Sequence, residues 1–212
     1  MKKENLNTIN LDATDYISEG CDKYCYQHPE NSSLCIKIGK PNAATINLGK
    51  ELEYFKKIKN KDTSKFEYLF YAQYHGEIQT NIGTGHVYDL IKDATTNTVS
   101  STLLHYLEID DSPFSDHYLA QELQRLKDQM IKHKIHAGDI RARNICVNIL
   151  NDHSMKLVII DGLGHRDFIP LADWFHYFSK KKIERRFVKN NLHSLEVQRK
   201  EIEDMRGLGA SS

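Results

Sequence analysis

The sequence predicts an α+β fold in which a small antiparallel sheet occupies roughly residues 1–91 and a mainly helical part occupies roughly residues 92–212. Three observations support this prediction. The 212 residues, 40% of them hydrophobic, suffice for one full core. Strand-like segments bounded by turn residues dominate the first half, and apolar residues at helical spacing dominate the second. We therefore expect a single domain, 1–212, made of two closely joined parts.

The segment 11–40 is expected to form a hairpin. It contains the turn-rich segment SEGCDKYCYQHPENSS, and the apolar run LCIKI at 34–38 follows as the second strand. Lys37 interrupts the apolar run of that strand. A lysine in a strand is most often exposed, so a functional role for Lys37 depends on a buried partner of opposite charge.

The next segment, NLGKELEYFKKIKN, predicts an amphipathic helix because Leu48, Leu52, Phe55 and Ile58 recur at spacings of three and four residues. At about 100° per residue, Glu51 projects about 45° from the centre of this apolar stripe, so we expect its carboxylate to be half-buried. A half-buried carboxylate needs a partner.

Residues 66–91 are expected to add two or three strands, with a hairpin turn at Gly83 and Gly85. The polar stretch KDATTNTVSST then marks a change of character near residue 92. Beyond it, HYLAQELQRLKDQMIKHKI predicts a long helix, followed by the polar loop HAGDIRARN and a hairpin formed by ICVNIL and LVIID. The apolar side of the long helix consists of Leu119, Leu123, Leu126, Met130 and Ile131.

The last segment, from Pro170, predicts a further helix. Its run KKKIERRFVK places six basic residues within 180–189. Such a run is usually a solvated face, and contact with an anionic membrane surface or an acidic partner is the alternative. The apolar side of this helix is expected to consist of Leu171, Trp174, Phe175 and Phe178.

Charge and composition exclude several classes of protein. Lys plus Arg equal Asp plus Glu at 29 each, so the chain lacks the overall basic charge typical of nucleic-acid binding. The N-terminus carries no secretory signal, and no run reaches the roughly 18 apolar residues of a membrane span. We therefore expect a cytoplasmic protein. The four cysteines are too few for a disulfide scaffold, so we expect free thiols.

Four polar residues occur in an order suited to phosphoryl transfer from ATP. That reaction needs a cation on the phosphates, oxygen ligands for magnesium and a carboxylate near the attacking hydroxyl. Asp139 and Asn144 stand five residues apart in the loop HAGDIRARN, and Asp161 ends a strand just before a glycine. Lys37 precedes them on its own strand. The alternative is that Asp139 and Asn144 only form a helix-to-strand turn, where both residue types are common.

The loop with His136, Gly138 and Asp139, followed by Asn144 and the Asp161-Gly pair, resembles the catalytic segments of protein kinases. Its His-x-Gly-Asp form is similar to that of small-molecule kinases related to aminoglycoside phosphotransferases. The resemblance implies a protein-kinase-like two-lobe fold with a truncated, mainly helical C-terminal lobe. It also implies ATP and Mg²⁺ as cofactors.

By the same resemblance, Asp139 is the catalytic base or the residue that orients the substrate hydroxyl. Asn144 and Asp161 are the magnesium ligands. Lys37 is the lysine that binds the nucleotide phosphates, and Glu51 is its partner on the helix. These roles are expectations carried over position by position from the kinase pattern.

A closer resemblance covers almost the whole chain. The segments G-x-x-x-x-C-Y-x-H-P at 20–29, L-C-I-K-I, E-L-x-Y, TNIGTGHVYDLI and LVIIDGLGHRDFIPLADW are similar to the bacterial YrbL family, called PhoP regulatory network proteins. The family name records a regulatory context rather than a reaction. The resemblance therefore indicates the fold more than the function.

Two departures from the kinase pattern bear on function. The loop expected to cover the nucleotide has a single glycine, Gly20, where typical kinases carry G-x-G-x-x-G. About fifty residues follow Asp161, too few for the activation segment and full helical lobe of a protein kinase. The first departure weakens the case for phosphate binding by the loop, and the second favours a small or unusual substrate.

Two functions stay open. The first is an ATP- and Mg²⁺-dependent phosphotransferase whose phosphate acceptor is a hydroxyl of a small molecule or a protein. The second is a pseudokinase that binds a nucleotide and acts as a regulatory or interaction protein without transfer. Arg141 and Arg143 either hold a phosphate or a substrate carboxylate, or only pair locally. Residues 165–167 (His-Arg-Asp) are candidates for lining the same cleft.

Overall fold

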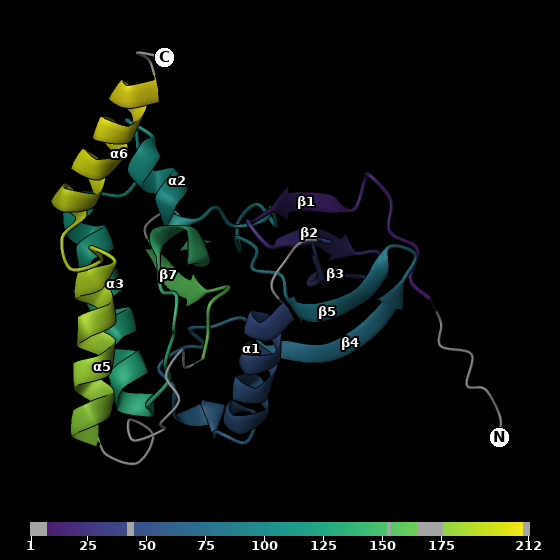
Figure 1. Ribbon diagram of the computed structural model, residues 1–212. Helices are drawn as coiled ribbons and strands as arrows, with labels where there is room; N and C mark the ends of the chain where they lie inside the picture. The colour runs from purple at the N-terminus through teal and green to yellow at the C-terminus, as the bar shows by residue number, and fades with distance from the viewer. Residues whose placement is uncertain (1–7, 42–44, 152–153, 165–175, 210–212) are drawn as a thin grey trace.

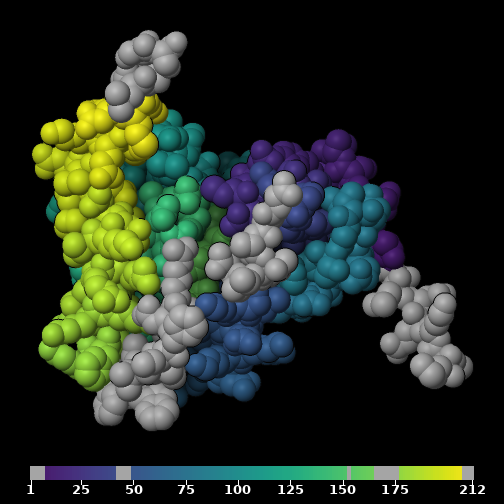
Figure 2. Space-filling model, in the orientation of Figure 1, coloured from purple at the N-terminus to yellow at the C-terminus, as the bar shows by residue number. Residues whose placement is uncertain are grey.

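The computed structural model describes residues 8–41, 45–151, 154–164 and 176–209. Within them the chain forms a five-stranded antiparallel sheet, a separate two-stranded hairpin and several helices, so the expected α+β class is confirmed. Figure 1 shows the sheet on one side of the molecule and the long C-terminal helices on the other. Figure 2 shows the same division, with purple to blue N-terminal residues on one flank and green to yellow helices on the other.

The described part of the sheet consists of β1 (Tyr16–Glu19), β2 (Lys23–His28), β3 (Asn31–Gly39), β4 (Tyr74–Thr80) and β5 (Gly83–Asp89). The order in space is β1-β2-β3-β5-β4, and every neighbouring pair is antiparallel. The strand expected at 34–38 is the second half of β3, and β2 is its hairpin partner. Within 66–91 the structure has two strands, and Gly83 and Gly85 lie at the start of β5, next to the turn.

Helix α1 (Thr45–Ile58) packs against the sheet along a face that includes an acidic residue. Leu52 is only partly buried, and the side chain of Leu48 lies outside the described part. The ring of Phe55 lies 5.6 Å from the ring of Tyr88 on β5, and this contact anchors the helix to the sheet. The expected helix is confirmed, but its buried face is rotated toward Glu51. That face consists of Glu51, Tyr54, Phe55 and Ile58.

The described C-terminal half contains α2 (Leu103–Glu108), α3 (Asp116–His133), β6 (Ile145–Asn151), β7 (Ser154–Ile159), α5 (His176–Lys189) and α6 (Leu195–Gly209). The long helix and the hairpin expected from the sequence are confirmed as α3 and β6–β7. Helix α3 begins where the Ser115 hydroxyl accepts a hydrogen bond from the Tyr118 N–H at 3.2 Å. It ends at His133, and the residue that caps it, Lys134, has a left-handed φ of 51°. None of the described helices combines the length and apolar character needed to cross a membrane.

The buried face of α5 differs from the one expected. Leu171, Trp174 and Phe175 lie outside the described residues, and Phe178 is 49% exposed. The side chains that α5 buries are Ser179, Ile183 and Phe187, which recur every four residues. The expected apolar side was therefore wrong at Phe178, because the clustered aromatic residues concealed this weaker four-residue pattern.

Residues 66–73 leave the sheet instead of extending it. Phe70 and Tyr71 are 0% and 3% exposed. The Ile159 N–H donates to the Phe70 carbonyl, and the Ala72 N–H donates to the Ile159 carbonyl, both at 2.9 Å. This segment therefore satisfies its backbone against the end of β7, which ties the sheet to the C-terminal half.

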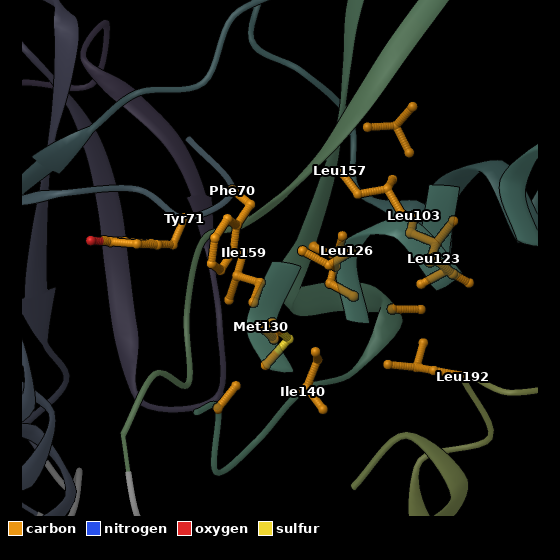
Figure 3. Close-up of a cluster of buried hydrophobic side chains, with 14 of the residues drawn as sticks. Phe70, Tyr71, Leu103, Leu123, Leu126, Met130, Ile140, Leu157, Ile159 and Leu192 are labelled. Carbon is orange, nitrogen blue, oxygen red and sulfur yellow. The ribbon is translucent and has the colours of Figure 1, made fainter. Parts of the chain in front are cut away.

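The core lies where α2 and α3 pack on the β6–β7 hairpin. Figure 3 shows Leu103, Leu126, Leu157 and Ile159 converging from these elements, with Phe70 beside them. All five are completely buried. Packing of the hairpin in this core also positions the two segments that flank it. The loop before β6 carries Asp139 and Asn144, and the segment after β7 carries Asp161. All four cysteines are free, as expected.

Candidate functional site

A cleft of about 1020 Å³ lies between the sheet and the segments that follow α3 and β7. Its walls come from β1 to β3, β5, α1 and the two C-terminal loops. The fold brings residues from these distant parts of the sequence to one place. All six residues expected to form the nucleotide site line this cleft: Gly20, Lys37, Glu51, Asp139, Asn144 and Asp161.

Lys37 is a buried cation that lines the cleft, and it is only 9% exposed. Its Nζ donates a hydrogen bond to the Ile160 carbonyl at 2.6 Å and lies 4.8 Å from the centre of the Tyr88 ring. Burial opposes its charge, but attraction to Asp161 and the neighbouring acidic groups outweighs burial and raises the pKa of Lys37. Lys37 is therefore charged in the folded protein.

The ion-pair partner of Glu51 differs from the expected one. Glu51 Oε2 lies 2.8 Å from Nζ of Lys23 on β2, and the same Nζ lies 3.1 Å from Asp161 Oδ1. Lys37 was expected in this position. Lys23 was not recognised from the sequence, because its position beside Glu51 depends on the register between β2 and β3. Cys25 lies opposite Lys37 across β2–β3, and Lys23, two residues before Cys25, shares its face of the sheet.

The two carboxylates that share Lys23 differ in their affinity for a proton. Burial, followed by repulsion from Asp161, raises the pKa of Glu51. Burial also opposes ionisation of Asp161, but attraction to Lys37 and Lys23 and a hydrogen bond from the Gly162 N–H lower its pKa well below the usual range. Asp161 is therefore the firmly ionised member of the pair.

Asp139 and Asn144 are held together by one loop. The amide Nδ2 of Asn144 donates to the Asp139 carbonyl at 2.8 Å. This bond fixes the orientation of the amide and leaves its oxygen, Oδ1, as the atom available to a ligand. The Asp139 carboxylate pairs with the Arg141 guanidinium, with Nε 2.8 Å from Oδ1. Arg141 thus pairs locally, whereas Arg143 lines the cleft.

Gly162 positions Asp139 from the other side. Its carbonyl accepts hydrogen bonds from the N–H groups of Gly138 and Asp139 at 2.9 and 3.2 Å. Its φ is +78°, and a Cβ at this position would lie 2.6 Å from the Asp139 carbonyl oxygen. Both the left-handed backbone and the close approach require glycine.

The Gly162→Ala substitution is expected to lower the free energy of unfolding by about 1–3 kcal/mol, because it combines an unfavourable φ with a backbone clash. The matched control is Gly49→Ala on α1, where a Cβ meets nothing within 4 Å. Alanine at position 49 is expected to stabilise the protein by roughly 0.5–1 kcal/mol. Urea unfolding measures both changes. Equal effects of the two substitutions would contradict the structural role of Gly162.

The donor set fits a divalent ion that arrives with phosphate groups. Asp161 offers a carboxylate and Asn144 an amide oxygen, and hard oxygen ligands suit Mg²⁺. No group of three or more His, Cys, Asp or Glu side chains suited to metal binding occurs among the described residues. Mg²⁺ usually keeps water and phosphate oxygens beside one or two protein ligands, so two ligands are sufficient.

The β1–β2 turn, which begins at Gly20, lines the cleft. The Gly20 N–H donates to the Lys23 carbonyl at 2.8 Å, so this amide is engaged within the turn. Cys25, which was not among the residues expected to form the nucleotide site, also lines the cleft. A hydrogen bond with Cys35 and the nearby charge of Lys37 lower the pKa of the Cys25 thiol to about 7, although burial acts in the opposite direction.

Residues 165–167, which were candidates for the same cleft, lie outside the described residues.

Comparison with known proteins identifies the family. The model of the family described as PhoP regulatory network protein YrbL matches residues 9–192. Two relatives, one from Escherichia coli strain K12 and one from Shigella flexneri, are each described as "Uncharacterized protein YrbL". Each is 28% identical over an alignment 198 residues long, which covers 90% of this chain and 91% of the relative. Because the family model covers most of the chain, the family resemblance seen in the motifs is confirmed, and this chain belongs to the family of the PhoP regulatory network protein YrbL.

Proposed function

We propose that this chain is an ATP- and Mg²⁺-dependent phosphotransferase with a protein-kinase-like fold, in which the sheet with α1 forms one lobe and the remainder the other. One observation carries the proposal. A buried lysine, a loop aspartate with its asparagine, and an aspartate at a strand end share one cleft, in the order that the kinase pattern requires. The proposal also includes two further points: the chain is a single domain, and it is located in the cytoplasm, where ATP is available.

Each residue has a defined task in this mechanism. Lys37, held charged by its acidic neighbours, neutralises the phosphates of the bound nucleotide. Asn144 Oδ1 and the Asp161 carboxylate would hold the metal, which would neutralise charge on the transferring phosphoryl group. The Asp139 carboxylate orients the acceptor hydroxyl and takes its proton. The same carboxylate forms an ion pair with Arg141. The acceptor is a hydroxyl of a small molecule or a protein.

A second candidate function is a nucleotide-binding pseudokinase that acts as a regulatory or interaction protein. One specific observation favours it: the chain's own cations pair with both functional carboxylates, Arg141 with Asp139 and Lys23 with Asp161. In a protein without transfer activity these pairs would be permanent. In the phosphotransferase they must rearrange when ligands bind.

Thermal unfolding with and without Mg²⁺-ATP tests the nucleotide site. At a nucleotide concentration near 100 times Kd, binding to the folded state stabilises by about 2.7 kcal/mol, which is a rise in Tm of roughly 5–10 °C for a chain of this size. We expect Lys37→Ala and Asp161→Ala to lose this rise. Lys65→Ala, at a side chain 76% exposed, is expected to keep it. A parent protein with no shift at millimolar nucleotide contradicts nucleotide binding, and with it both candidate functions.

A further inference from the structure

Lys23 connects two carboxylates that come from different parts of the chain. Its Nζ lies 2.8 Å from Glu51 Oε2 on α1 and 3.1 Å from Asp161 Oδ1 after β7. The side chains of Lys23, Glu51 and Asp161 are 19%, 8% and 35% exposed. These three residues form an ion-pair triad, called here the Lys23 triad, that is largely withdrawn from solvent.

Two cations therefore reach the region around Asp161 from neighbouring strands. Lys37 extends from β3, and its Nζ donates a hydrogen bond to the Ile160 carbonyl at 2.6 Å. Lys23 reaches from β2 and holds the carboxylate oxygen of Asp161 itself. The two lysines have different partners, so they are not equivalent, and Lys23 is the one in the place expected for a metal ion.

An ammonium group and a divalent ion on one carboxylate repel each other because both are cations, so the ammonium group of Lys23 weakens metal binding at Asp161. Without ligands, the buried Glu51 and the partly buried Asp161 need a counter-charge, and Lys23, together with the nearby Lys37, provides it. When a metal ion with phosphate groups arrives, that need disappears and new anionic oxygens appear nearby. A lysine side chain is flexible and carries three donors, so it can exchange one oxygen partner for another.

We propose that Lys23 is a resident counter-cation that occupies the divalent-metal position at Asp161 and transfers to the nucleotide phosphates when the metal-nucleotide binds. This proposal rests on the proposed nucleotide site and adds a residue to it. Lys23 follows the β1–β2 turn directly, and both the turn and Lys23 line the cleft. Its ammonium group is therefore placed to leave Asp161 and remain within the same cleft, in contact with phosphate oxygens.

The competing interpretation is that Lys23 is only a structural bridge between β2 and α1. A structural bridge keeps its ion pairs with Glu51 and Asp161 when the metal-nucleotide binds, so its removal leaves the affinity for ATP at saturating metal unchanged. A resident counter-cation competes with metal and then contacts phosphate, so its removal both tightens metal binding and weakens ATP binding. Metal affinity and ATP affinity together therefore separate the two interpretations, and unfolding measurements alone do not.

The first experiment uses Mn²⁺ alone, as a paramagnetic probe for the Mg²⁺ position, and measures free Mn²⁺ by electron paramagnetic resonance. Lys23→Met is expected to bind Mn²⁺ at least about tenfold more tightly than the parent, because a charge about 3 Å from the ligand oxygen is removed. Lys23→Arg keeps the charge and is expected to stay close to the parent. If Lys23→Met does not fold, Lys23→Gln replaces it with the same expectation.

Lys40→Met is the matched control. Lys40 lines the same cleft, but its Nζ pairs with Glu19 at 3.0 Å. Its removal changes the net charge by the same amount as Lys23→Met and is expected to leave Mn²⁺ affinity within about twofold. A folded neutral variant at position 23 that binds Mn²⁺ no better than the parent, or no better than Lys40→Met, overturns the proposal.

The second experiment measures ATP binding by calorimetry at a Mn²⁺ concentration that saturates the metal position in every variant. The neutral Lys23 variants are expected to bind ATP at least about fivefold more weakly under these conditions, since a phosphate contact is lost. Unchanged ATP affinity in these variants would contradict the proposed transfer of Lys23 to the nucleotide phosphates. The Mn²⁺ experiment needs no nucleotide. A parent that binds Mn²⁺ but no ATP would therefore contradict the proposed function. The effect of the Lys23 substitutions on Mn²⁺ affinity would still be measurable in that case.

Discussion

Asp139→Asn is expected to lower phosphoryl transfer from Mg²⁺-ATP by about 10²–10⁴-fold, the usual contribution of a positioned general base. Asparagine keeps the shape of the side chain but cannot accept the proton of the acceptor hydroxyl. Transfer to water, measured as phosphate release, provides a readout that does not require the natural acceptor. Nucleotide affinity, followed by the rise in Tm, is expected to stay within a fewfold of the parent, because Asp139 acts on the acceptor rather than on the nucleotide.

The control for this substitution is Asp111→Asn, an exposed aspartate outside the cleft. It removes the same charge and is expected to leave phosphate release unchanged. Phosphate release by Asp139→Asn at the parent's rate would contradict a role for Asp139 in transfer. A parent that is stabilised by Mg²⁺-ATP but releases no phosphate and labels no acceptor would favour the pseudokinase function instead.

Leu126→Ala is expected to lower the free energy of unfolding by about 3–5 kcal/mol. Leu126 is completely buried in α3, among residues from β7, α2 and the segment before β4 (Figure 3). The substitution removes three carbon atoms and leaves a cavity that a packed core closes only in part. Urea unfolding followed by circular dichroism measures the change, and the midpoint is expected to fall while the denaturant dependence stays constant.

Leu150→Ala is the matched control, because it is the same chemical change at a side chain 40% exposed on β6. Its cost is expected to stay below about 1 kcal/mol, since less apolar surface is withdrawn from water there. Similar costs at the two positions would mean that α3 and the hairpin do not form the main core.

The sequence alone predicted the parts of the fold that depend on local periodicity. Apolar spacing identified α1 and α3, and turn residues between short apolar runs identified the β2–β3 and β6–β7 hairpins. Local periodicity is read from neighbouring residues, so no tertiary contact is needed to recognise it. It was misleading at Phe178, where conspicuous aromatic residues masked a weaker four-residue pattern.

The sequence also identified the residue types that the cleft brings together, because Asp139 and Asn144 share one loop and Asp161 ends a strand. Only the tertiary structure decided which charges meet. Glu51 pairs with Lys23, and Lys37 bonds to the Ile160 carbonyl, because the β2–β3 register and the packing of α1 fix these distances. Register and helix packing arise from contacts between residues far apart in the chain. The residues of the candidate site could therefore be selected from the sequence, and their ion pairs required the folded chain.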